Sequence, residues 1–93
     1  MPELKRVHVL VQGRVQGVYY RASTRDRALA LHLTGWVKNL ADGNVEFEAQ
    51  GDAINVENLL SWAEQGPPNA RVSKLDCRRL DIITTETSFD IIY

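Results

Sequence analysis

The sequence predicts an α+β sandwich with a ferredoxin-like βαββαβ layout, in which two helices cover one face of an antiparallel sheet. Short segments of apolar and polar alternation predict strands, and two segments with apolar residues at helical spacing predict helices. Each half of the 93-residue chain has the order strand–helix–strand, which suits this fold. A chain of this length is expected to form a single domain, residues 1–93.

Alternation is clearest in two of the predicted strands. In residues 6–12 three valines alternate with other side chains, and in residues 45–50 apolar residues alternate with Glu or Gln. The Asp42-Gly43 pair before the second segment predicts a tight hairpin turn, since glycine readily adopts a positive φ. Further strands are expected over residues 36–40, around Lys74–Leu80 and over residues 89–93, the last as a terminal addition to the βαββαβ order.

The helices are expected over residues 22–33 and 53–65. In the first, Ala22, Leu29 and Leu33 are expected to share one side. The second is amphipathic, and Asp52 is placed to cap its start. Its apolar stripe consists of Val56, Leu59, Leu60 and Ala63.

Composition and charge exclude several classes of protein. The single cysteine, Cys77, rules out an intrachain disulfide, and polar residues interrupt the first apolar run. A cytoplasmic protein without a membrane partner is therefore expected. Residues 1–38 hold seven basic and two acidic residues, whereas residues 39–93 hold four basic and ten acidic ones. In a chain of net charge −1, a basic first segment indicates a local anion site rather than a broad nucleic-acid surface.

The segment GRVQGVYYR, residues 13–21, carries the most chemistry. A loop with two glycines leads from a strand into a helix, where free backbone amides and the helix dipole favour an oxyanion. Arg21 follows, and its guanidinium can bind two phosphate oxygens at once. From pattern alone, an ordinary surface turn followed by a solvated arginine is slightly favoured over a phosphate cradle. Walker A and cysteine-phosphatase loops are both excluded.

The chain resembles the acylphosphatase family over nearly its full length. The motifs that carry the resemblance are GRVQGVYYR, Thr24, GWVKNLADGNVE at 35–46, GPP at 66–68 and FDIIY at 89–93. The resemblance implies hydrolysis of acyl phosphates, which are carboxylic–phosphoric mixed anhydrides, to carboxylate and inorganic phosphate. It implies no cofactor and no metal ion. The implied partners are a small acyl phosphate and inorganic phosphate as product and competing ligand.

The resemblance also implies the roles of individual residues. Arg21 matches the arginine that binds the phosphate, and Asn39 matches the residue that holds the attacking water. Thr24 and Gly13 match supporting positions near the site. Backbone amides for the phosphate come from Val15, Gln16, Gly17, Val18, Tyr19 and Tyr20.

Two departures from the family pattern stand near these motifs. Where the family often has a small or aromatic residue followed by Phe, this chain has Tyr19 and Tyr20. Tyr20 keeps the aromatic ring and adds a hydroxyl. His32 occupies a helix end where glycine is common, so the helix is expected to end differently in detail.

Several candidate residues also have purely structural interpretations. Asn39 precedes a hairpin, where Asn is common, and pattern alone favours that role. The two histidines lack ligand-spaced partners, so a metal site is not expected. The remaining expectations are a small core residue at Cys77, packing roles for Trp36 and Trp62, and a solvated strand face with Glu46 and Glu48. The tyrosine pair either packs against the first helix, which the sequence slightly favours, or places Tyr19 in the pocket lining.

Two rival functions share this fold. An RNA-recognition module needs basic and aromatic residues on its third strand, but here that strand carries Glu46 and Glu48, so no nucleic-acid partner is expected. A non-catalytic anion-binding domain would keep the same cradle, and the presence of both Arg21 and Asn39 favours catalysis. The polar exposed face and short final strand indicate a monomer.

Overall fold

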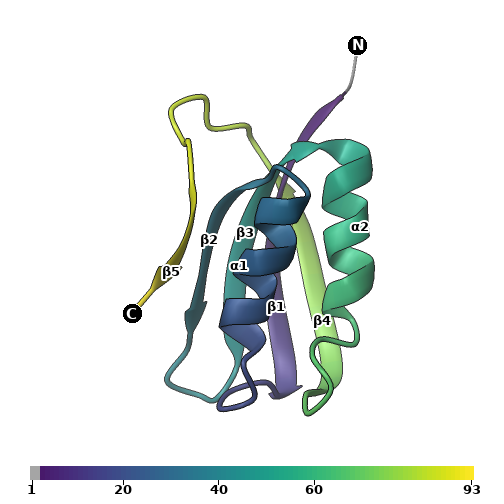
Figure 1. Ribbon diagram of the computed structural model, residues 1–93, viewed down its shortest axis with the longest axis vertical. Helices are drawn as coiled ribbons and strands as arrows, with labels where there is room; N and C mark the ends of the chain where they lie inside the picture. Colours follow the sequence, from purple (N-terminus) through teal and green to yellow (C-terminus); the bar gives the residue numbers. More distant parts are fainter. Residues whose placement is uncertain (1–2) are drawn as a thin grey trace.

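The computed structural model describes residues 3–93, which form five strands and two helices. In chain order the elements are β1 (Leu4–Arg14), α1 (Tyr20–Ala30), β2 (Thr34–Asn39), β3 (Val45–Asp52), α2 (Ala53–Ala63), β4 (Arg71–Leu80) and β5 (Phe89–Ile92). The strands form one sheet in the order β4-β1-β3-β2-β5, and both helices pack on the same face (Figure 1). The predicted α+β, ferredoxin-like fold is therefore confirmed.

The sheet is mixed rather than wholly antiparallel, which corrects one part of the prediction. β1, β2, β3 and β4 pair antiparallel, but β5 runs parallel to β2, with Gly35 opposite Phe89. The segment of residues 81–88 leaves β4 at one edge and crosses the end of the sheet where β2 begins (Figure 1). β5 therefore enters the opposite edge from the same end as β2 and must run in the same direction.

The core lies between the helices and the covered face of the sheet. Strand alternation predicted the inward residues correctly: Val7, Val9 and Val11 of β1 are fully buried, as are Phe47 and the other apolar positions of β3. The stripe of α2 is also confirmed, because three of its four residues are buried and Leu60 is partly buried against the core. Asp52 caps α2 as expected, its carboxylate accepting a hydrogen bond from the Ile54 amide over 3.0 Å.

The predicted face of α1 is wrong. The helix buries Tyr20, Thr24 and Ala28, whereas Leu29 is exposed and Leu33 is buried only beyond the end of the helix. The reason is Tyr20, with which α1 begins. Its ring lies 5.5 Å from that of Trp62, and its hydroxyl donates to the Ala63 carbonyl over 2.7 Å. This large anchored side chain sets the rotation of the helix about its axis. It also confirms a packing role for Trp62.

His32 ends α1 in an unusual way. Its backbone has φ 58°, in the left-handed region. The amide of Leu33 donates to the Ala28 carbonyl and that of His32 to the Leu29 carbonyl. This is the Schellman arrangement, in which glycine is the usual residue at the left-handed position. The predicted departure at this helix end thus takes the form of a histidine in a glycine conformation.

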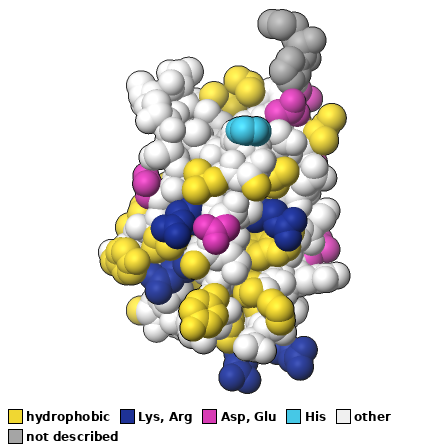
Figure 2. Space-filling model, in the orientation of Figure 1, with side chains coloured by type: hydrophobic (Ala, Val, Ile, Leu, Met, Phe, Trp, Pro, Cys, Tyr) yellow, Lys and Arg dark blue, Asp and Glu magenta, His cyan; other side chains and the backbone are white. Residues whose placement is uncertain are grey.

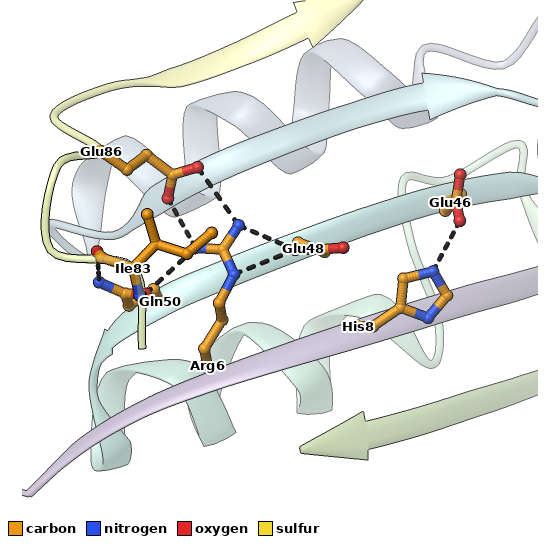
Figure 3. A network of polar contacts seen from close by, with 7 residues as sticks. All are labelled: Arg6, His8, Glu46, Glu48, Gln50, Ile83 and Glu86. Carbon is orange, nitrogen blue, oxygen red and sulfur yellow. Dashed lines mark hydrogen bonds and ion pairs between the residues drawn. The ribbon is translucent and has the colours of Figure 1, made fainter. Parts of the chain in front are cut away.

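The open face of the sheet holds a network of ionic contacts (Figure 3). Arg6 is buried, with 1% exposure, and its guanidinium donates to Glu48, Gln50 and Glu86. Burial opposes the charge on Arg6, but the hydrogen bonds and charges of Glu86 and Glu48 outweigh it and raise the pKa of Arg6. Arg6 was not recognised from the sequence, because only the tertiary structure brings Glu86 to it.

This network corrects the prediction of a simple solvated strand face. Glu48 pairs with Arg6, and Glu46 accepts from Nε2 of His8 over 2.6 Å when that nitrogen is protonated. Both carboxylates are only partly exposed, because the cross-strand neighbours of β3 supply their partners. His8 accordingly has a carboxylate partner on the neighbouring strand.

Cys77 is not a core residue. It lies on β4, an edge strand with mostly exposed side chains, and its thiol is free and exposed. The reason is positional, since α2 covers β1 and β3 more fully than this edge. Trp36, on β2, is partly buried, and Nζ of Lys38 lies 5.8 Å from its ring centroid.

Candidate functional site

One pocket brings together residues from three distant parts of the sequence. It lies where the loop after β1, the start of α1, the end of β2 and the C-terminal strand meet at one end of the sandwich (Figure 1). Its volume is about 370 Å³. The lining residues are Val15, Gly17, Tyr19, Tyr20, Arg21, Ala22, Asn39, Ile91 and Tyr93. Arg21 and Asn39, the two predicted catalytic residues, therefore face the same concave space.

Side chains of the loop hold it against the β2–β3 hairpin. The Gln16 side-chain amide donates to the carbonyl of Leu40 over 2.7 Å and to that of Asn44 over 2.8 Å. Val15 and Val18 are buried in the core, with 1% and 6% exposure. These contacts fix the loop relative to the end of β2. Because Leu40 follows Asn39 directly, they also fix the loop relative to Asn39.

The loop backbone is shaped to present its amides. Gly17 has φ 75° and Tyr19 has φ 66°, so two left-handed residues turn the chain just before α1 begins. Among the hydrogen bonds of residues 3–93, none is donated by the backbone amides of Val15 to Tyr19. Successive free amides in such a turn, followed by a helix N-terminus, form an anion-binding concavity.

Arg21 lies at the second residue of α1 and is partly exposed toward the pocket. Its guanidinium carbon is 5.2 Å from the centroid of the Tyr93 ring, a cation–π contact. Within the described chain, Arg21 has no carboxylate at ion-pair distance, unlike Arg6 or Arg79. An arginine that is positioned by an aromatic ring and not neutralised by an acid is available to an incoming anion.

Asn39 is the last residue of β2 and lies across the pocket from the loop. Its Oδ1 is buried and has no hydrogen-bond partner, the one such side-chain atom among residues 3–93. A buried unpaired amide oxygen costs about 1–3 kcal/mol. An orphaned acceptor beside an anion site is suited to a transient donor such as a water molecule.

Some predicted site residues contribute backbone or support rather than pocket surface. Thr24 is fully buried and its hydroxyl donates to the Tyr20 carbonyl over 2.7 Å, so it stabilises the first turn of α1 and does not face the pocket. Gly13 has φ 127°, and a Cβ there would lie 2.1 Å from the Arg71 carbonyl oxygen. It is therefore required where β1 passes β4. The side chains of Gln16 and Val18 point away from the lining, as their contacts show.

The two residues of the tyrosine pair have different environments. Tyr20 packs in the core, whereas Tyr19 is 80% exposed and lines the pocket, which is the alternative that the sequence left open and not the favoured packing of both rings. Sequence reasoning also missed Ala22, Ile91 and Tyr93 as lining residues. The FDIIY segment was recognised as a motif, but its place beside Arg21 depends on β5 pairing with β2.

The end of the molecule that bears the pocket carries basic side chains. On the helix-covered face, basic side chains protrude at the end of the molecule that bears the loop (Figure 2). No group of three or more His, Cys, Asp or Glu side chains in residues 3–93 is arranged to hold a metal ion. In the same residues, no helix is long and apolar enough to cross a membrane.

Comparison with known proteins gives a consistent result. A sequence model described as Acylphosphatase matches residues 7–91. A curated acylphosphatase from Methylococcus capsulatus is 55% identical over 89 residues, covering 96% of this chain and 97% of the relative. The solved acylphosphatase of Coxiella burnetii has 39% identity and a TM-score of 0.90, covering 96% of this chain and 93% of that one.

The solved acylphosphatase of Bacillus subtilis has 31% identity and a TM-score of 0.91, covering 98% of this chain and all of that one. Matches in sequence, in length and in fold thus agree with one another. The chain belongs to the acylphosphatase family and is an enzyme that hydrolyses acyl phosphates.

Proposed function

We propose that the pocket holds the phosphoryl group of an acyl phosphate between the loop amides and Arg21, and that Asn39 orients the attacking water. One observation carries this proposal: Arg21 and Asn39 line the same pocket as a loop whose backbone amides, from Val15 to Tyr19, donate no hydrogen bonds within the described chain. The pocket therefore combines a cation, several donors and an unpaired amide oxygen around a space of small-molecule size.

The reaction makes one bond and breaks one. The water oxygen forms a bond to phosphorus, and the bond from phosphorus to the bridging oxygen breaks. The carboxylate leaves with the bonding electron pair, and a phosphoryl oxygen of the substrate accepts the proton of the water. The leaving carboxylate has a pKa of roughly 4–5 in solution, so it departs without a general acid. This chemistry suits a pocket built on Arg and Asn.

Charge neutralisation and positioning then supply the catalysis. Phosphoryl transfer spreads charge over the equatorial oxygens, which the Arg21 guanidinium and the loop amides can stabilise. Fixed donors in a partly dry site stabilise developing charge without having to reorganise. Holding the water in line can contribute up to about 7–11 kcal/mol in favourable cases. Two side chains and a loop are therefore energetically sufficient.

The setting of the reaction is also proposed. Residues of one chain are enough to bring Arg21 and Asn39 to the same pocket, so the proposed reaction requires no second subunit. The exposed free thiol of Cys77 is in keeping with a reducing compartment such as the cytoplasm. The reaction as written needs no cofactor, and its ligands are a small acyl phosphate and inorganic phosphate.

Arg21→Ala tests the phosphate role, assayed with a synthetic aryl acyl phosphate in the presence of a chelator. We expect loss of hydrolysis and of competition by inorganic phosphate, with an unchanged circular dichroism spectrum. Arg25→Ala is the matched control, because Arg25 lies on the same helix outside the pocket lining and faces Asp26. A fully active Arg21→Ala protein, or activity that the chelator abolishes, would contradict the proposal.

A further inference from the structure

Two tyrosine rings border the pocket without being buried by the fold. Tyr19 is 80% exposed and Tyr93 is 98% exposed. The one aromatic pair in contact among the described residues is Tyr20 with Trp62, so neither pocket tyrosine has a ring partner in the chain. A tyrosine typically buries about 150–250 Å² when it is packed. The pocket therefore has a large area of uncovered aromatic surface at its rim.

The backbone at Tyr19 argues that this ring does not serve the fold. Its φ of 66° lies in the left-handed region, where a bulky side chain is strained. Glycine adopts this conformation freely, as Gly17 does two residues earlier. Because the ring is exposed, its packing contributes little free energy to offset this strain. A strained aromatic residue at the mouth of a pocket points to a role in binding.

The second ring lies next to the phosphate-binding arginine. The Tyr93 ring lies against Arg21, with 5.2 Å between guanidinium carbon and ring centroid. Ile91, two residues earlier on the chain, lines the same pocket. One side of the guanidinium is thus next to an apolar wall while its donors remain free for phosphate. Apolar and aromatic side chains therefore border the same pocket as the phosphate-binding arginine.

We propose that Tyr19, Tyr93 and Ile91 form an acyl subsite that favours a flat aromatic acyl group over a small aliphatic one. The proposal rests on the phosphoryl site proposed above, because the bound phosphate directs the acyl group toward these side chains. An aromatic acyl group contacts the exposed rings and removes apolar surface from water, whereas an acetyl group is too small to cover them. Tyr19 and Tyr93 are then specificity-determining residues.

The test is the ratio of kcat/KM for benzoyl phosphate to kcat/KM for acetyl phosphate. We expect Tyr19→Gly and Tyr93→Ala each to lower this ratio by roughly two- to tenfold, mainly through a higher KM for benzoyl phosphate. Tyr19→Phe and Tyr93→Phe keep the rings and should keep the ratio. Ile54→Ala is a control at an exposed apolar residue on α2, away from the pocket, and should also keep it.

The ratio of the two kcat/KM values distinguishes a defect in acyl recognition from a defect in phosphate binding. If Tyr93→Ala also makes Arg21 more mobile, kcat/KM falls for both substrates and the ratio does not change. Tyr19→Gly removes a strained residue, so its thermal midpoint should not fall. If either variant stays folded and active with an unchanged ratio, its ring has no part in acyl recognition and the subsite is wrong. Full activity of Arg21→Ala toward both substrates would instead overturn the phosphoryl site.

Discussion

The guanidinium of Arg6 donates to the carboxylate of Glu86 over 2.8 Å, although the two residues are 80 positions apart in the chain (Figure 3). Gln50 adds two contacts to the same segment, since its amide donates to the Ile83 carbonyl and its oxygen accepts from the Ile83 amide. This segment leads directly into β5, which carries Ile91 and Tyr93 to the pocket. An ionic network on the open face therefore holds the segment that leads to one wall of the site, and this wall lies at the end of the sheet where β2 ends.

Removal of Glu86 should destabilise the protein more than a surface ion pair does. We expect Glu86→Ala to lower the free energy of unfolding by about 1.5–3 kcal/mol, because a charged hydrogen bond to a buried guanidinium is lost. Glu3→Ala is the control, since its contact with Arg79 is exposed and such pairs contribute about 0–1 kcal/mol. Urea unfolding of the two variants measures the difference. Equal losses would mean that the network is no more than a surface contact.

Asn39→Ala should separate turnover from phosphate binding. If Asn39 holds the water, kcat should fall on the order of 100-fold, the loss expected from a misplaced reacting group. The inhibition constant of inorganic phosphate should change much less, because the loop amides and Arg21 remain. Stability should be kept, since the substitution removes a buried oxygen without a partner. Steady-state kinetics with phosphate as inhibitor measure both effects, and matched losses would contradict the water-holding role.

Tyr20→Phe should show how much the buried hydroxyl contributes to the free energy of unfolding and how that contribution changes with pH. Near neutral pH we expect a loss of about 1 kcal/mol in the free energy of unfolding, because the Ala63 carbonyl loses its donor. Burial raises the pKa of Tyr20 above its ordinary value of 10.0. The unfolded phenol therefore ionises first, and the native protein loses stability as pH rises above 10.0.

The Phe variant lacks this ionisable group, so the stability gap between the two proteins should narrow as pH rises above 10.0. Denaturant unfolding at neutral and at alkaline pH measures the gap. The exposed tyrosines are common to both proteins and cancel in the comparison. A gap that widens at alkaline pH would show that the Tyr20 phenol is not protected in the native state.

His32→Gly should stabilise the protein. A residue with a side chain loses about 1–2 kcal/mol of stability in this left-handed backbone conformation, and glycine avoids that loss. Glycine also gives the unfolded chain more conformational freedom, which offsets part of the gain. A net gain of about 0.5–1 kcal/mol is expected, measured as a shift in the urea midpoint. His32→Ala keeps the Cβ and should give no gain. Equal midpoints for the Gly and Ala variants would argue against backbone strain.

Local patterns predicted most of the fold. Alternation identified the inward residues of β1 and β3, and helical spacing identified the buried stripe of α2. The face of α1 was predicted wrongly, because its phase depends on contacts of Tyr20 with Trp62 and Ala63, which come from a distant helix. Cys77 was misplaced for a similar reason, since burial on an edge strand depends on how far the neighbouring helix extends.

Three features could be predicted without coordinates: the strand–loop–helix motif with Arg21, the hairpin that follows Asn39, and membership of a family through motifs in one register. The folded chain was needed to show that Arg21 and Asn39 face one pocket, that Tyr19 points outward while Tyr20 is buried, and that Tyr93 lies against Arg21. The difference follows from the range of the interactions. Turns, caps and alternation depend on neighbours along the chain, whereas the pocket depends on the pairing of β5 with β2 and on ionic contacts between residues far apart in sequence.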